Sequence, residues 1–201
     1  MALMMATLGS AALSVAMALV MMSAAPRRCA STGVDVLLLI DGMSSSPDGQ
    51  AAAVRAIKAL DSACPIGDID AQDPRGHTAL YAAIARRMNR VALFLMGAFQ
   101  ADPLIATPTR MAPLARSVLS ACDGTADARE SLFMTRIILE RWTLKGAARS
   151  AIGAIIDGLR VPTRDHGPTE TLAEALGRCQ GNAAPVRSLL AAYGSTTVAG
   201  A

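Results

Sequence analysis

Apolar residues recur at helical spacing from residue 79 onward. Leu80, Ala83 and Ile84 lie at positions i, i+3 and i+4, which places them on one face of a helix. Thr78 comes just before this apolar stripe, and threonine is a preferred residue for capping a helix N-terminus. We therefore expect a helix that begins at about Ala79 and buries this face against a neighbour.

The residues on either side of this helix predict a turn before it and a second helix after it. Asp73 and Gly76 provide the side-chain acceptor and the missing Cβ that a tight turn requires. Asn89 then interrupts the pattern, and the run 91–96 is apolar at every position. Because a surface helix is apolar on one face only, this second helix must be covered on more than one side. Further helices must therefore pack around the pair.

The landmarks of this segment recur along the chain. The sequence at 112–115 lies 34 residues after that at 78–81, and this spacing is close to the period of about 33 residues in ankyrin arrays. A further copy begins at residue 164 and continues through Leu172. Since Leu114 and Leu172 are 58 residues apart, additional chain is inserted between these copies.

Three more segments have apolar residues at helical spacing. Residues 147–162 predict an extra helix on the basis of Ala151, Ile152, Ile155, Ile156 and Leu159. Residues 132–139 predict the second helix of the middle copy, with Phe133 among its apolar positions. Upstream, a helix at 35–40 and another around 54–60 predict a capping pair.

These residues resemble the ankyrin repeat family, whose pattern is a turn with Asp and Gly, then Thr-Pro-Leu-His, an alanine, and a Leu-Leu pair before a final glycine. No copy in this chain is perfect. The first has Thr78 and Leu80, with alanine and tyrosine in the proline and histidine places. The second has Pro113 and Leu114 without the threonine, and the last has Thr171 in the proline place.

The resemblance implies an all-α, ankyrin-type helical-hairpin solenoid with an inserted helix. The domain would span residues 30–198, with a capping repeat at 34–70, repeats at 73–103, 107–146 and 165–195, and the insertion at 147–162. The alternative is another helical-hairpin solenoid, or an irregular all-α domain in which the spacing reflects only a core.

The resemblance also implies a surface for a protein partner, formed by the turn tips and the exposed side of the first helix of each pair. Carried onto this sequence, that face comprises Pro74, Arg75, His77, Ala85, Arg86, Arg110, Arg116, Arg164 and His166. Its arginines favour an acidic or carboxylate-bearing partner, because a guanidinium pairs with a carboxylate through two hydrogen bonds. Alternatively, these charges are merely solvated, because arginine is simply the common basic residue in a chain with two lysines.

We therefore expect a non-catalytic protein-protein interaction scaffold with no cofactor or metal. The sequence contains no nucleophile elbow, phosphate-binding loop, paired metal-binding histidines or dinucleotide fingerprint. The alternative is a small cell-envelope enzyme or enzyme regulator, with residues 147–162 as a lid and with His77 or His166 placed against Cys122 or an aspartate. A net charge of +3 and an aromatic content of 3% argue against nucleic-acid binding.

Residues 1–25 carry no charge and end in Ser23, Ala24 and Ala25, small residues of the kind that a signal peptidase recognises. Export to the periplasm or outside the cell is our first interpretation. An inner-membrane anchor with a cytoplasmic domain is an alternative, because the apolar length could span a bilayer and Arg27 and Arg28 follow it. A misassigned start and a cytoplasmic protein form the third interpretation.

The four cysteines lack the spacing of a metal site. Cys122 and Cys179 fall near the ends of equivalent first helices, and stacked helices lie about 8–10 Å apart. A disulfide tolerates a Cα separation of about 7 Å at most. We therefore expect at least two of the four, which also include Cys29 and Cys64, to be small buried apolar residues, unless inserted loops bring them closer.

Overall fold

The computed structural model describes residues 29–107, 111–122, 128–144, 146–163, 169–179 and 183–196. The described chain is predominantly helical, so the all-α class is confirmed. The predicted segment 1–25 and three predicted site residues, Arg110, Arg164 and His166, lie outside these ranges. No helix within the described ranges combines the length and apolar character that crossing a bilayer requires.

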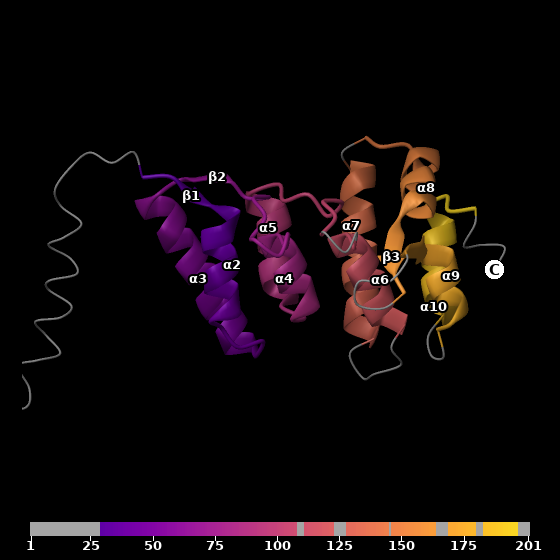
Figure 1. Cartoon of the computed structure of the whole chain (residues 1–201), viewed down its shortest axis with the longest axis horizontal. Coiled ribbons are helices and arrows are strands. Elements are labelled where there is room, and N and C mark those ends of the chain that lie inside the picture. Colours follow the sequence, from indigo (N-terminus) through magenta and orange to yellow (C-terminus); the bar gives the residue numbers. More distant parts are fainter. Residues whose placement is uncertain are drawn as a thin grey trace, which may run out of the picture.

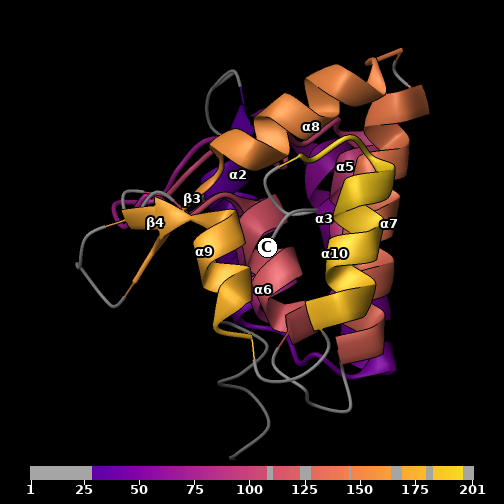
Figure 2. The same cartoon turned by 90° about the vertical axis from the view of Figure 1, so that its right-hand side faces the viewer.

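The helices follow one another as pairs along the long axis of the molecule (Figure 1). In chain order they are α2 (Gly33–Asp41), α3 (Pro47–Ala63), α4 (Ala79–Ala85), α5 (Asn89–Ala98), α6 (Pro113–Cys122), α7 (Ala128–Leu144), α8 (Arg149–Gly158), α9 (Leu172–Gly177) and α10 (Ala183–Ala192). Helix α4 packs against both α2 and α6, which connects successive pairs. Seen from the C-terminal end, α8 lies across one end of α9 and α10 (Figure 2).

Two short sheets accompany these helices. Strand β1 (Ser31–Thr32) pairs in parallel with β2 (Ile66–Asp68), so the start of the first helix pair is joined to its end. Strand β3 (Arg160–Pro162) pairs antiparallel with β4 (Thr169–Thr171). The helix expected in the inserted segment is α8, and the same segment also contributes β3.

The turn and cap predicted before α4 are confirmed. Oδ1 of Asp73 accepts hydrogen bonds from the backbone N–H groups of Arg75 (2.9 Å) and His77 (2.8 Å). Gly76 has a φ of 75°, a conformation that glycine adopts without steric cost. The Thr78 hydroxyl accepts a hydrogen bond from the backbone N–H of Tyr81 at 3.1 Å, and α4 begins at the next residue.

The hydrogen bonds that close this turn recur 34 residues later. The backbone N–H of Asp73 donates to the His77 carbonyl at 3.0 Å, and the backbone N–H of Thr107 donates to the Met111 carbonyl at 3.3 Å. The Thr107 hydroxyl accepts from the Met111 N–H at 3.3 Å, as the Asp73 carboxylate does from His77. The recurrence seen in the sequence therefore corresponds to a repeated pair of hydrogen bonds between the first and last residues of the two segments.

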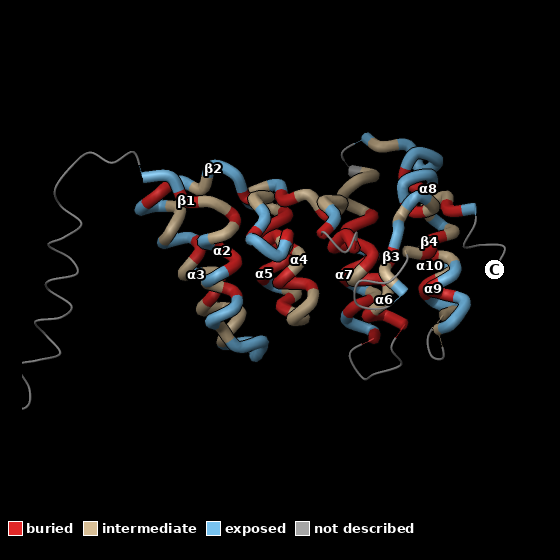
Figure 3. Tube along the Cα trace, in the orientation of Figure 1, coloured by how far each residue is buried: buried red, intermediate tan, exposed pale blue. Residues whose placement is uncertain are grey.

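The core lies in the seams between successive helices (Figure 3). Leu80, Leu95 and Leu114 are all completely buried, as is Ala83. The expectation that the helix of residues 91–96 is covered on more than one side is confirmed, because α5 packs against both α3 and α4. Leu93 and Phe94 are only partly buried.

Thr171 occupies a different position from the one predicted. It is the N-cap of α9 and accepts a hydrogen bond from the Glu174 backbone N–H at 3.2 Å, so it plays the role that Thr78 plays for α4. The Glu174 side chain accepts in turn from the Thr171 backbone N–H at 2.7 Å. Alignment on leucine therefore misplaced the last copy by one residue, because Leu172 is buried at the first helical position.

The expectation for the cysteines is wrong, since all four form disulfides. Cys29 is bonded to Cys64 and Cys122 to Cys179, with Cα separations of 5.1 and 5.7 Å. Cys122 is the last residue of α6, and Cys179 lies two residues beyond α9. Both cysteines are thus at or just beyond helix ends, where the chain can approach more closely than the spacing of the helix axes would allow.

Candidate functional site

A small hollow between α2 and α4 brings together four residues of the predicted face, Arg75, His77, Ala85 and Arg86. It has a volume of about 140 Å³, and its lining residues are Leu37, Asp41, Arg75, His77, Tyr81, Ala82, Ala85 and Arg86. We refer to it as the α2–α4 hollow. Its volume is below the range of about 300–1,000 Å³ that is usual for small-molecule pockets.

Arg75 is held at the rim of the hollow by two carboxylates. Its Nε donates to Oδ2 of Asp73 at 2.9 Å, and a terminal nitrogen lies 3.6 Å from Oδ2 of Asp41. The hydrogen bond with Asp73 raises the pKa of the Arg75 guanidinium further above its usual value. The side chain nevertheless remains 64% exposed, so a partner can reach it.

Asp73 orients Arg75 and His77 by accepting hydrogen bonds from both residues. Burial by itself would raise the pKa of its carboxyl group, but the hydrogen bonds from His77 and Arg75 have the larger combined effect, and the pKa is lowered. Only 6% of its side chain is exposed. The turn that presents Arg75 and His77 is therefore organised around an ionised carboxylate.

Arg86 connects the C-terminal ends of α4 and α2. It is the C-cap residue of α4, and its guanidinium donates to the carbonyls of Asp41 (3.0 Å) and Met43 (2.6 Å). The same group lies 3.4 Å from Oδ1 of Asp41. These carbonyls belong to the end of α2 and the turn after it, so the side chain also has a structural role.

The rings of His77 and Tyr81 form one wall of the hollow. They are stacked, with centroids 4.9 Å apart and an interplanar angle of 18°. The Tyr81 hydroxyl donates to the Met111 sulfur at 3.9 Å, which connects this wall to the next repeated turn. Stacking restricts both side chains, so a partner would meet a preorganised surface.

The two arginines of the hollow are balanced by Asp41, which lines it, and by Asp73, which pairs with Arg75 from outside the lining. Arg75 and Arg86 contribute two positive charges, and Asp41 and Asp73 contribute two negative charges within ion-pair distance. A partner carboxylate would therefore compete with Asp41 for Arg75. The sequence missed Asp41, because an aspartate at the end of a predicted helix gives no sign that it faces arginines from the next pair.

Two other described members of the predicted face, Pro74 and Arg116, do not line the hollow. Arg116 lies in α6, and its Nε atom is buried without a hydrogen-bond partner among the described residues. Arg178, which was not singled out from the sequence, is the C-cap of α9. Both of its terminal nitrogens pair with the Glu170 carboxylate. Arg178 thus occupies in α9 the position of Arg86 in α4.

Only one part of the enzymatic alternative is present at this site, where His77 shares the hollow with Asp41. The sulfur of Cys122 is in a disulfide, and α8 contacts α7, α9 and α10, at the other end of the row of helices from the hollow (Figure 1). Within the described ranges, no group of three or more histidine, cysteine, aspartate or glutamate side chains could hold a metal ion.

Comparisons with known proteins add no further constraint. No protein family, curated protein or solved structure matches this chain. Function must therefore be inferred from the geometry of the molecule and from the properties of its surface.

Proposed function

We propose that this chain is a non-catalytic protein-protein interaction module, built as an ankyrin-type solenoid with an inserted helix. Support for the architecture comes from the hydrogen bond between residues 73 and 77 that recurs between residues 107 and 111, and from the helix pairs that follow one another in a row (Figure 1). Such arrays present turn tips and first helices to their partners.

The α2–α4 hollow is the observation that carries the functional proposal. Arg75 and His77 project from a turn whose conformation is determined by Asp73, and Tyr81 stacks on His77. Preorganised side chains lower the entropic cost of binding. Tyrosine and arginine are also enriched among the residues that dominate interface energies. The hollow can therefore act as the centre of a protein contact.

The proposed partner presents a carboxylate to Arg75. An acidic side chain from the partner could form a two-point pair with the exposed guanidinium. Because Asp41 and Asp73 balance the positive charge of Arg75, the long-range attraction between the hollow and an acidic partner is weak. The ion pair with Arg75 therefore forms only when the two proteins are in contact. We therefore expect affinity to fall only moderately when salt is raised from 0.05 to 0.5 M, by about tenfold or less.

We further propose that the module works in the periplasm or outside the cell. Support comes from the two disulfides, which persist in oxidising compartments and are rare in the cytoplasm. This proposal agrees with the small residues that end the uncharged segment 1–25.

The binding proposal is tested by affinity capture from the source cell, mass spectrometry of the captured protein, and titration of that purified protein by calorimetry. Arg75→Glu and His77→Ala should each weaken binding by about tenfold while leaving helicity unchanged. Arg55→Glu, the same charge change on the exposed surface of α3, should alter affinity by less than about twofold. Equal affinities for all four proteins would remove the hollow as the contact surface.

A further inference from the structure

A second concave surface lies at the ends of α3, α5 and α7 that are opposite to the edge carrying β1 and β2 (Figure 1). It has a volume of about 490 Å³, and the described residues that line it are Pro47, Gln50, Asn89, Arg90, Arg129, Glu130 and Phe133. All seven belong to the first two turns of these three helices. We call this surface the helix-start groove, and it shares no residue with the α2–α4 hollow.

The described residues that line the groove carry an excess of positive charge. Arg90 and Arg129 are both exposed, whereas Glu130 is its only carboxylate among the described lining residues. An oxygen of Glu130, in α7, accepts a hydrogen bond at 3.2 Å from the side chain of Asn89, in α5, so this carboxylate already has a partner. The first turns of α5 and α7 add the positive ends of their helix dipoles.

The groove also contains an unusual apolar feature. Phe133 is 57% exposed, whereas the remaining five aromatic side chains outside histidine are at least partly buried. In the sequence, Phe133 served only as one of the apolar positions that predict a helix over 132–139, and α7 forms there, but the Phe133 side chain is exposed. Exposed aromatic side chains next to arginines are typical of the centres of protein interfaces.

The polar groups of the groove are held in place by the helices that form it. Oε1 of Gln50, from α3, accepts a hydrogen bond from the Arg90 backbone N–H at 2.9 Å. The Asn89–Glu130 hydrogen bond connects α5 to α7 in the same way. The groove is therefore continuous across three successive helix pairs, and its shape does not depend on a single loop.

We infer that the helix-start groove binds an acidic peptide segment of a partner protein. An apolar side chain of the peptide packs on Phe133, and carboxylates on either side of it pair with Arg90 and Arg129. Charge complementarity selects an acidic occupant, since two guanidiniums face one carboxylate that Asn89 already engages. Five of the seven lining residues are exposed, and such an open surface suits an extended segment better than an enclosed small molecule.

A peptide selection tests this inference. The oxidised full-length chain is immobilised, and a displayed library of random decapeptides is passed over it through several rounds. We expect the recovered peptides to be enriched in an apolar residue flanked by aspartate or glutamate. A library that yields no such enrichment, or that yields basic peptides, would overturn the inference.

Affinity of one recovered peptide, labelled with fluorescein, is then measured by fluorescence anisotropy. Arg90→Glu and Arg129→Glu should each weaken binding by about fivefold or more, and Phe133→Ser should weaken it by about tenfold. Arg75→Glu, at the α2–α4 hollow, serves as the matched control and should leave the affinity within about twofold.

The variants distinguish this inference from the function proposed for the hollow. Binding that depends on Arg75 but not on Phe133 or Arg90 would overturn the groove and leave the hollow intact. Competition by N-acetylglutamate at the concentration of the peptide itself would show that a small carboxylate is sufficient and would exclude a peptide as the occupant. Loss of peptide binding in the groove variants alone supports the inference.

Discussion

Asp73 illustrates how one side chain determines the presentation of its neighbours. Its carboxylate accepts hydrogen bonds from the backbone of Arg75 and His77 and from the Arg75 side chain. These bonds close the turn and orient the two residues that we place at the centre of the α2–α4 hollow. The turn was predictable because every group that makes it lies within five consecutive residues.

Replacing Asp73 by asparagine should destabilise the protein in a pH-dependent way. The pKa of Asp73 is lowered from its ordinary value of 3.8, so the ionised carboxylate favours the folded state. This contribution is fully present above pH 3.8 and is lost as the pH falls through the lower folded-state pKa. We expect Asp73→Asn to cost about 1 kcal/mol at pH 7, because asparagine retains one acceptor.

Urea unfolding of both proteins between pH 7 and pH 2.5 measures this difference. The free energies of unfolding of wild type and variant should converge toward the acidic end. A cost that is constant across the range would show that the charge of Asp73 does not contribute.

Gly76 should be sensitive to substitution for a conformational reason. Its φ of 75° lies in the region that side chains with a Cβ rarely adopt, and Gly76→Ala should cost about 1 kcal/mol. Gly67→Ala is the matched control, because a Cβ at Gly67 in β2 meets no atom within 4 Å. Thermal unfolding should show a lower melting temperature for the first variant only, and equal melting temperatures would contradict the assigned turn.

Helix α4 shows how a short element is stabilised by its neighbours. It has seven residues, fewer than an isolated helix needs in water, and it lies between α2 and α6. Its cap and its apolar face were both predictable from local sequence. The contact between Arg86 and Asp41 was not predictable from local sequence, because the two residues are 45 positions apart and belong to different helices.

Leu80→Ala should test the packing of this element. Leu80 is completely buried between neighbouring helices, and its truncation should lower the free energy of unfolding by about 2–5 kcal/mol. Leu38→Ala provides the matched control, since Leu38 is 64% exposed and should cost less than about 0.5 kcal/mol. Chemical denaturation of both variants gives the comparison, and similar costs would show that the assigned helix register is incorrect.

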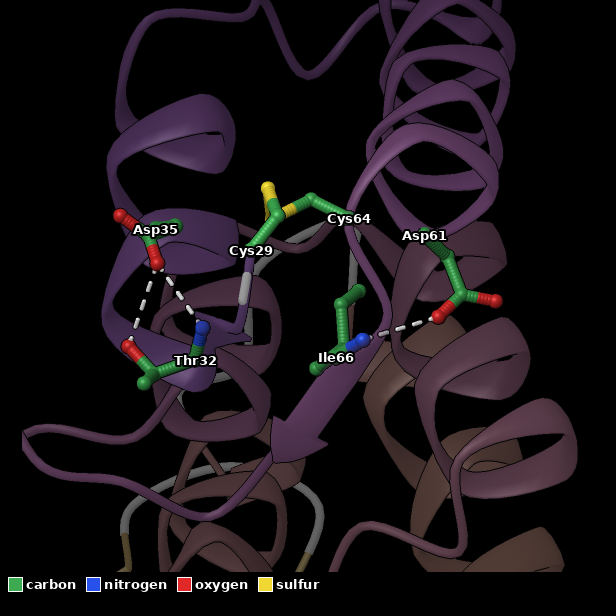
Figure 4. Close-up of a disulfide and its surroundings, with 6 residues drawn as sticks. All are labelled: Cys29, Thr32, Asp35, Asp61, Cys64 and Ile66. Carbon is green, nitrogen blue, oxygen red and sulfur yellow. Dashed lines mark hydrogen bonds between the residues drawn. A yellow bond between two sulfur atoms is a disulfide. The ribbon is translucent and has the colours of Figure 1, made fainter. Parts of the chain in front are cut away.

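At the scale of the whole molecule, the two disulfides constrain opposite ends of the row of helices. Cys29–Cys64 joins the start of the described chain to the end of α3, beside the hydrogen bonds that Asp35 and Asp61 accept there (Figure 4). Cys122–Cys179 joins the end of α6 to the end of α9, and the inserted segment lies between these two helices in the sequence. The insertion is thus enclosed in a covalent loop.

Opening the second disulfide should destabilise the protein substantially. The bond closes a loop of 57 residues in sequence separation, and the chain-entropy relation gives a stabilisation of about 4 kcal/mol. The double variant Cys122→Ser/Cys179→Ser should unfold at a correspondingly lower urea concentration. Mass spectrometry of non-reduced tryptic fragments tests the pairing directly, and any other combination of the four cysteines would contradict this arrangement.

The sequence by itself determined what depends on neighbouring residues. The helical class, the turn at 73–77, the cap at Thr78 and the start of α4 all arise from hydrogen bonds and apolar spacing within one or two turns of chain. Such contacts form between residues that are close together in the sequence, so the sequence alone is enough to predict them.

Only the tertiary structure decided which distant groups meet. The Cys122–Cys179 bond, the contact of Arg86 with Asp41 and the exposure of Phe133 depend on where separate helices end and how each is rotated about its axis. A shift of one residue turns a helical side chain by about 100°, which is enough to move it between core and surface. The packing of all the helices together determines that rotation, and both proposed binding surfaces follow from it.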